Sequence, residues 1–107
     1  MGGVGTFSEG LKVLRDGGHQ ELSANLIPYT VTNMGSALLG IDIGFLGPTY
    51  SISTACATSN YCLHAAANHI KKGIVDVMLA GGTEACILPA GLAGFVACRY
   101  VCFLIKT

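Results

Sequence analysis

The chain has 107 residues, enough for one small domain with a hydrophobic core. Hydrophobic residues make up 51% of it and charged residues only 11%, against about a quarter in an ordinary globular domain. The net charge is zero and the basic residues are scattered, which excludes the basic footprint of a nucleic-acid or membrane-surface protein. So few charged side chains cannot cover a free-standing domain, and we expect the chain to belong to a larger polypeptide or an oligomer.

The cysteines and the apolar C-terminal part bear on compartment and membrane insertion. Five cysteines without a CxxC pair, and an N-terminus without the regions of a secretory signal, indicate a reducing compartment. The best candidate for a transmembrane helix, residues 85–105, is interrupted by Pro89 and Arg99, so we interpret it as protein interior. Cys98 and Cys102 are four residues apart, but a metal site needs more ligands, so we expect core packing and no metal.

Two helices are predicted in the first half of the chain. Apolar residues at helical spacing predict a short helix over residues 7–14, ended by the glycine pair 17–18. Residues 26–32 are predicted to be irregular, and a second helix is predicted over residues 33–41, where small residues allow another backbone to approach closely. Glycine and proline predict a turn over residues 44–49.

The next part of the chain predicts a strand, a helix and a second strand. Alternating and β-branched residues predict a strand over residues 50–55, followed by a tight turn at Cys56. An alanine-rich run without glycine or proline then predicts a helix up to Gly73. Residues 74–80 predict a buried strand, followed by a close-approach turn at 81–84. This order predicts an α/β fold with a right-handed crossover and a parallel sheet.

Cys56 is the candidate nucleophile. At the start of a helix, free backbone N–H groups and the helix dipole favour the thiolate, the form that attacks a carbonyl carbon. The alternative is a small core residue, because free cysteine is among the most buried residue types. His64 lies eight residues on, which at about 1.5 Å per helical residue is roughly 12 Å away and beyond hydrogen-bond reach. We therefore expect His64 and His69 to be surface or hydrogen-bonded residues, which argues against a cysteine hydrolase.

Several motifs along the chain resemble those of one enzyme family. The sequence around Cys56 reads GFLGPTYSISTACATSNYC and continues with AAANHIKKGIVDVMLAGGTEA. With NMGSALLGIDI before them and GLAGFVACR after them, these motifs resemble the β-ketoacyl-acyl-carrier-protein synthases, condensing enzymes of the thiolase fold. The resemblance runs from about Gly2 to Arg99, and SISTACATSNYC is most similar to the plastid members. A different enzyme of the thiolase fold is disfavoured by the combination of TACATS with GGTE.

The resemblance implies a fold, a reaction and three site residues. The fold would be a partial thiolase-like α/β fold, with a mixed sheet and a buried helix following Cys56. Cys56 would take an acyl group from acyl carrier protein, and the thioester would condense with malonyl-acyl-carrier-protein during fatty acid elongation. Phe95 would line the acyl pocket and Arg99 would face the acidic carrier protein, with no cofactor or metal. The strand over Tyr50–Ala55 would pair with its counterpart in a homodimer.

The resemblance ends at Arg99, where the sequence continues as YVCFLIKT. Residues 1–107 are therefore predicted to be a fragment of the N-terminal half of a β-ketoacyl synthase, with a divergent tail over residues 100–107. The family's two histidines and lysine come from the other half, so we expect the chain alone to accept an acyl group at most. The alternative is a non-catalytic short form that pairs with full-length subunits as an interaction protein. The resemblance implies the plastid stroma for a plant protein and the cytoplasm otherwise, and no targeting peptide is recognised.

Overall fold

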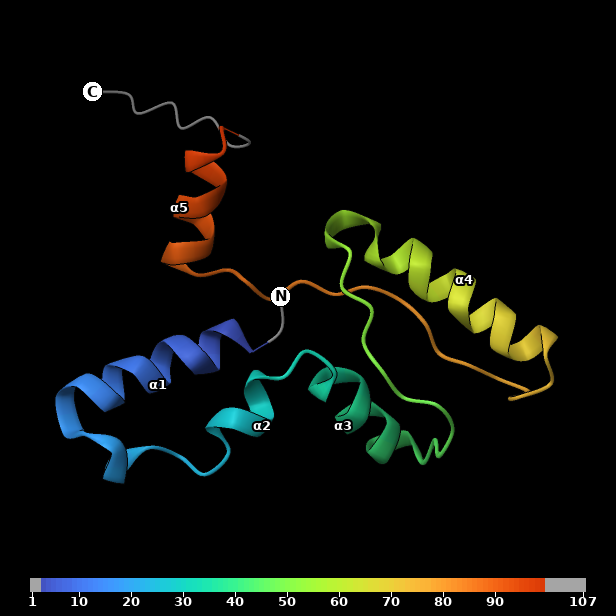
Figure 1. Ribbon diagram of the computed structural model, residues 1–107, viewed down its shortest axis with the longest axis horizontal. Helices are drawn as coiled ribbons and strands as arrows, with labels where there is room; N and C mark the ends of the chain where they lie inside the picture. The colour runs from blue at the N-terminus through green and yellow to red at the C-terminus, as the bar shows by residue number, and fades with distance from the viewer. Residues whose placement is uncertain (1–2, 100–107) are drawn as a thin grey trace.

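The computed structural model describes residues 3–99, and its first two helices pack against each other (Figure 1). Helix α1, Val4–Gly17, confirms the first predicted helix and ends at Gly18, whose φ of 80° is left-handed. Helix α2, Leu26–Thr30, occupies a segment that was predicted to be irregular. The two helices approach closely because Gly10 has no side chain: a Cβ there would lie 2.5 Å from Cδ1 of Leu26. A 3-10 turn, η1, His19–Glu21, lies between them.

Helix α3, Met34–Ile43, confirms the second predicted helix. Gly44 ends it with a left-handed φ of 74°, and the N–H of Phe45 donates to the carbonyl of Gly40 at 2.8 Å. The helix is apolar on several sides, and its large side chains are exposed. The exposed ones are Leu38, Leu39, Ile41 and Ile43.

The predicted sheet is absent from the described part of the chain. No strand is present within residues 3–99, so both the parallel sheet and the mixed sheet of a thiolase-like α/β fold are wrong for this structure. Residues 50–54 and 74–80 are irregular, and no backbone hydrogen bond joins the two segments. A strand is stabilised by hydrogen bonds to a neighbouring strand, and here neither segment has such a neighbour.

The predicted helix after Cys56 is present, but its predicted burial is wrong. Helix α4 spans Thr58–Lys71 and ends just before Gly73, whose φ of 67° is left-handed. Only Ala66 of this helix is buried, at 6% exposure. The prediction of burial assumed a sheet against which the alanine-rich face would pack. Because no sheet forms, α4 keeps most of its surface in contact with solvent.

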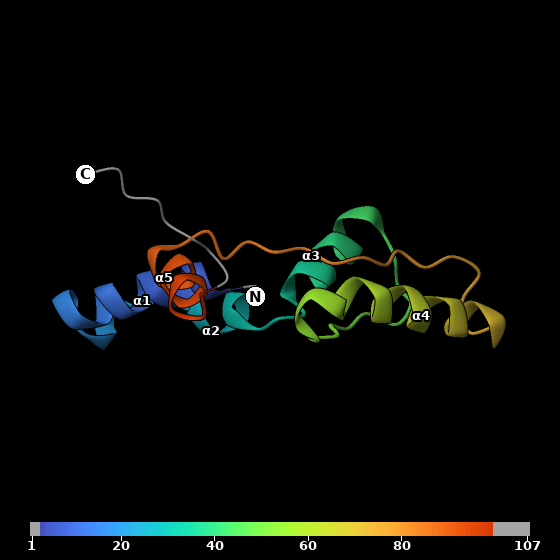
Figure 2. The same cartoon turned by 90° about the horizontal axis from the view of Figure 1, so that it is seen from above.

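Helix α5, Pro89–Ala97, stands apart from the other helices (Figure 1). Among the described residues it packs against no other helix. Seen from above, the whole arrangement is a thin layer (Figure 2), with extents of 56 × 41 × 18 Å. Its radius of gyration is 17.7 Å, whereas a compact chain of this length has about 13 Å. The predicted divergent tail lies outside the described residues, as does Cys102.

The structure leaves a large apolar surface uncovered. The total accessible surface of the chain is 8510 Å², against about 5,600 Å² expected for a folded monomer of this mass. Within residues 3–99 the buried hydrophobic residues are Ala66 and Cys86 alone, while Leu46 and Ile87 are more than nine-tenths exposed. The expectation that this chain needs further protein around it accords with these areas. No helix of the described part is long and apolar enough to cross a membrane.

Candidate active site

Cys56 lies on a short turn directly before α4. The turn is a 3-10 helix, η2, Ala55–Ala57, and α4 begins at the next residue, Thr58. The side chain of Cys56 is exposed, and its thiol forms no hydrogen bond within residues 3–99. The first N–H groups of a helix lack intrahelical acceptors and form the positive end of its dipole. The structure therefore presents the thiol to solvent beside a helix N-terminus, and the alternative of a buried core cysteine is wrong for this residue.

The backbone around Cys56 has an unusual conformation. Ala55 has a φ of 49°, in the left-handed region that residues with a Cβ rarely adopt. The N–H of Ala57 donates to the carbonyl of Thr54 at 3.1 Å and closes the turn. The hydroxyl of Thr58 donates to the carbonyl of Ala55 at 2.7 Å and accepts from the N–H of Thr54 at 3.0 Å. Backbone and side-chain hydrogen bonds together hold the turn that carries Cys56.

The segment at residues 81–84 was predicted to be a close-approach turn. It passes close to the same helix end but forms no turn. A Cβ on Gly82 would lie 3.2 Å from Cβ of Ser59 and 3.3 Å from its backbone N. Ser59 belongs to the first turn of α4, so the GGTE motif and the turn of Cys56 meet at one end of this helix. At the end of the motif, the carboxylate of Glu84 accepts a hydrogen bond from the N–H of Cys86 at 2.9 Å. The two motifs are about 25 residues apart, and their meeting was not predicted from the sequence.

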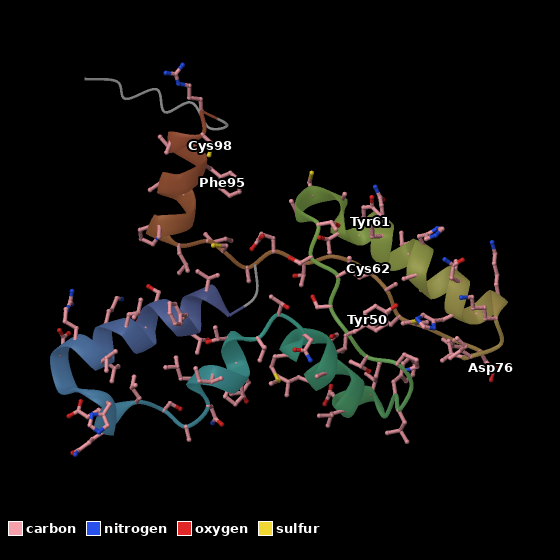
Figure 3. The ribbon with its side chains drawn as sticks, viewed as in Figure 1. Tyr50, Tyr61, Cys62, Asp76, Phe95 and Cys98 are labelled. Carbon is pink, nitrogen blue, oxygen red and sulfur yellow. The ribbon has the colours of Figure 1, made fainter. Side chains whose placement is uncertain are left out.

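Two histidines of α4 are hydrogen-bonded away from Cys56, as predicted. Nε2 of His64 is 3.0 Å from the side-chain amide of Asn68 on the same helix face. Nε2 of His69 is 3.0 Å from the hydroxyl of Tyr50, which lies beside the C-terminal half of α4 (Figure 3). Nδ1 of His69 is buried and has no hydrogen-bond partner in the described part of the chain. Neither histidine serves Cys56 as a base here.

Phe95 and Arg99 lie on or next to α5, away from Cys56. Phe95 is about half exposed (Figure 3). Arg99 is exposed and has a left-handed φ of 60°. Because α5 contacts neither η2 nor α4, the structure does not bring these two residues to the nucleophile. Their roles in the acyl pocket and in carrier binding stay predictions.

A groove on the described surface lies elsewhere, between α1 and α2. It is an open groove of about 530 Å³ that none of the residues of η2 or α4 lines. Its wall carries the carboxylates of Glu9 and Glu21 beside the apolar side chains of Leu22 and Leu26. Residues 3–99 hold no cluster of three side chains suited to a metal ion.

Comparison with known proteins gives one consistent result. The family model described as "Beta-ketoacyl synthase, N-terminal domain" matches residues 1–103. The chain is 66% identical to 3-oxoacyl-[acyl-carrier-protein] synthase I, chloroplastic, of Arabidopsis thaliana, over 92% of the chain and 21% of that relative. It is 54% identical to the chloroplastic synthase II of the same plant, over 92% of the chain and 18% of the relative. A 3-oxoacyl-[acyl-carrier-protein] synthase 2 of Staphylococcus aureus is 36% identical, over 92% of the chain and 25% of the relative. The chain thus spans about a fifth of the length of these relatives.

Proposed function

Because the chain belongs to the β-ketoacyl synthase family, whose N-terminal domain it matches, we propose that Cys56 is the nucleophile of a fatty acid condensing enzyme. The observation that carries the proposal is the position of the Cys56 thiol, exposed on a turn before the first residue of α4. A long acyl thioester can reach such a thiol from solvent. The relatives are named for synthesis on acyl carrier protein, so the acyl donor is proposed to be an acyl-acyl-carrier-protein.

In the first step, the Cys56 thiolate attacks the carbonyl carbon of the acyl thioester. A new C–S bond forms to Cys56, and the carbonyl oxygen becomes an oxyanion. The N–H of Cys56 makes no hydrogen bond within residues 3–99, so it is available to stabilise this oxyanion. The C–S bond to the carrier then breaks, and the carrier thiol leaves with the proton that Cys56 had lost. The product is an acyl-Cys56 thioester.

In the second step, malonyl-acyl-carrier-protein loses carbon dioxide and the resulting carbanion attacks the acyl-Cys56 thioester. A C–C bond forms, the bond to Cys56 breaks, and the Cys56 thiolate is restored. Decarboxylation needs groups that stabilise the developing carbanion. His64 is hydrogen-bonded to Asn68 and His69 to Tyr50, and neither supplies such a group. We therefore propose that this chain by itself stops at the acyl-Cys56 thioester, and that condensation needs residues from the rest of a complete synthase.

The proposed function also includes an acyl pocket, a carrier contact, a dimer and a location. We place Phe95 in the wall of the acyl pocket and Arg99 against the acidic carrier protein, in keeping with their exposure. Homodimerisation is proposed at residues 50–55, because residues 51–53 form no backbone hydrogen bond within the described part and are free to pair with another chain. A plastid location is proposed from the chloroplastic relatives.

The test of the proposed function is the intact mass of the chain after incubation with an acyl carrier protein that carries a medium-length acyl group. We expect one acyl adduct on the unmodified sequence and none on Cys56→Ser. Cys98→Ser is the matched control, because Cys98 is also exposed, and it should keep the adduct. An adduct that survives Cys56→Ser, or no adduct in a soluble sample, would refute the assignment of Cys56.

A second function is favoured by the total accessible surface, which exceeds that of a folded monomer of this mass, and by the many exposed large hydrophobic side chains. The chain would be a non-catalytic partner of a complete synthase subunit. Native mass spectrometry after co-expression with a complete 3-oxoacyl-[acyl-carrier-protein] synthase I tests this alternative. A mixed dimer in which Cys56→Ser changes nothing supports the non-catalytic role, and complete subunits that pair only with each other refute it.

A further inference from the structure

The hydroxyl of Thr58 links two backbone groups around Ala55, the residue that precedes Cys56. It donates a hydrogen bond to the carbonyl of Ala55 at 2.7 Å and accepts one from the N–H of Thr54 at 3.0 Å. Threonine hydroxyls often bond to nearby backbone groups in this way at turns and helix starts. Here the hydroxyl uses both its donor and its acceptor capacity, and the side chain is half-buried.

The bridged residue is the strained one. Ala55 has a φ of 49°, a conformation that an alanine backbone disfavours by roughly tenfold or more relative to its usual regions. A residue in this region persists only when its surroundings impose the conformation. The bonds made by the Thr58 hydroxyl are two of four that hold this turn. The N–H of Ala57 donates to the carbonyl of Thr54 at 3.1 Å, and the N–H of Thr58 donates to the carbonyl of Ala55. If the left-handed turn relaxed, Cys56 would point in a different direction relative to the start of α4.

We propose that Thr58 is a positioning residue for Cys56: its hydroxyl locks Ala55 in the left-handed conformation and thereby fixes the thiol beside the N-terminus of α4. The inference rests on the proposed function, since it explains how the nucleophile is presented. Thr58 touches neither the thiol nor a substrate in this arrangement. Its effect is transmitted through the backbone of Ala55.

The test is the rate of alkylation of individual cysteines by iodoacetamide, measured by peptide mass mapping of the whole chain over a range of pH. Cys98, which is exposed on another helix, serves as the reference within the same molecule. Cys86, which is buried, reports on loss of structure. Three variants are compared. Thr58→Val removes the hydroxyl at nearly constant shape, and Thr58→Ser keeps it. Ala55→Gly removes the strain of the left-handed conformation, which the hydroxyl is proposed to hold in place.

We expect Cys56 to react faster than Cys98 in the unmodified sequence, and equally fast in urea. Thr58→Val should slow Cys56 by about three- to tenfold, the effect of losing one or two hydrogen bonds. Thr58→Ser should stay within about twofold of the unmodified sequence, since it keeps both bonds. In the Ala55→Gly background, Thr58→Val should have a smaller effect, because glycine adopts the left-handed region without strain.

Three results would overturn the inference. They are an unchanged profile in Thr58→Val, an equal loss in Thr58→Ser, and a loss in Thr58→Val that is accompanied by faster alkylation of the buried Cys86. Alkylation needs no carrier protein, so this test is independent of acyl transfer. A Thr58-dependent profile without an acyl adduct would refute the proposed function alone, and an adduct without Thr58 dependence would refute the positioning role alone.

Discussion

Helix α4 and the segment that follows it, residues 74–80, lie side by side but are held by different interactions (Figure 1). Beyond its first turn, each N–H of a helix finds its acceptor four residues earlier in the same segment. The N–H groups of residues 74–80 have no such acceptors within their own segment. The one backbone hydrogen bond from this segment to α4 joins the N–H of Ile74 to the carbonyl of His69 at 3.0 Å. An amphipathic or alanine-rich stretch can therefore form its secondary structure alone, whereas a stretch with strand propensity needs a second strand.

This difference matters for Cys56 because the two kinds of structure meet at its turn. On one side the turn continues into α4, and on the other it follows the unpaired residues 51–53. Cys56 is thus ordered from the helical side. Variants that damage α4 should disturb it strongly, and variants in the extended segments should disturb it little.

The largest effect is expected from a proline in α4, compared with a proline in the segment that follows it. Ala66→Pro removes a hydrogen bond and introduces a clash in the middle of α4, at a cost of about 3 kcal/mol or more. Val77→Pro is the matched control, because Val77 is exposed and makes no backbone hydrogen bond in the described part. We expect Ala66→Pro to reduce the helical circular dichroism and abolish acylation of Cys56, and Val77→Pro to preserve both. Equal losses in the two variants would show that the extended segment is as ordered as the helix.

A smaller effect is expected where an extended segment rests on a helix. A Cβ on Gly91, in the first turn of α5, would lie 2.6 Å from the carbonyl oxygen of Cys86 and 2.8 Å from its Sγ. Gly91→Ala should therefore separate the two and cost about 1–3 kcal/mol, which would appear as faster alkylation of the buried Cys86. Gly94→Ala is the matched control, since no atom lies within 4 Å of its Cβ position. It should instead stabilise α5 by about 1 kcal/mol, and faster alkylation of Cys86 in both variants would contradict the contact.

The smallest effect is expected from the hydrogen bond that ties the segment before Cys56 to α4. Tyr50→Phe removes the bond between the Tyr50 hydroxyl and Nε2 of His69, which is worth about 1 kcal/mol. Tyr61→Phe removes an exposed hydroxyl that makes no hydrogen bond within residues 3–99 and is the control. The urea midpoint of the helical signal should fall slightly for Tyr50→Phe and not at all for Tyr61→Phe. A larger shift for Tyr61→Phe would contradict the role of the Tyr50 contact.

The sequence predicts the parts of this structure that depend on local interactions. Periodicity located α1 and α3, an alanine-rich run without glycine or proline located α4, and left-handed glycines end α1 and α3. Helix α2 was not predicted because it contains Pro28, which is tolerated at the third position of a helix, where its missing N–H has no intrahelical acceptor. The strands were wrong because β-propensity describes what a segment does beside a partner strand.

In the candidate site, too, the local features were predictable from the sequence and the contacts between distant segments were not. Cys56 could be placed at a helix start from the residues around it, because a turn and a helix are local structures. The bridging role of Thr58 could not, since alanine seldom adopts the left-handed conformation that Ala55 has here and the sequence carries no signal for it. The approach of Gly82 to Ser59 depends on how the chain returns after α4, which no local pattern specifies.

Both proposals require that α4 and the turn of Cys56 are ordered without a sheet behind them. Amide hydrogen exchange of the whole chain, resolved to segments by mass spectrometry, tests this requirement most directly. We expect slow exchange in α4 after its first turn, and exchange close to the rate of an unfolded chain at residues 51–53 and 75–80. Protection of residues 75–80 equal to that of α4 would mean that they pair in a sheet after all. An unprotected α4 would mean that nothing holds Cys56 in place, and both proposals would fail.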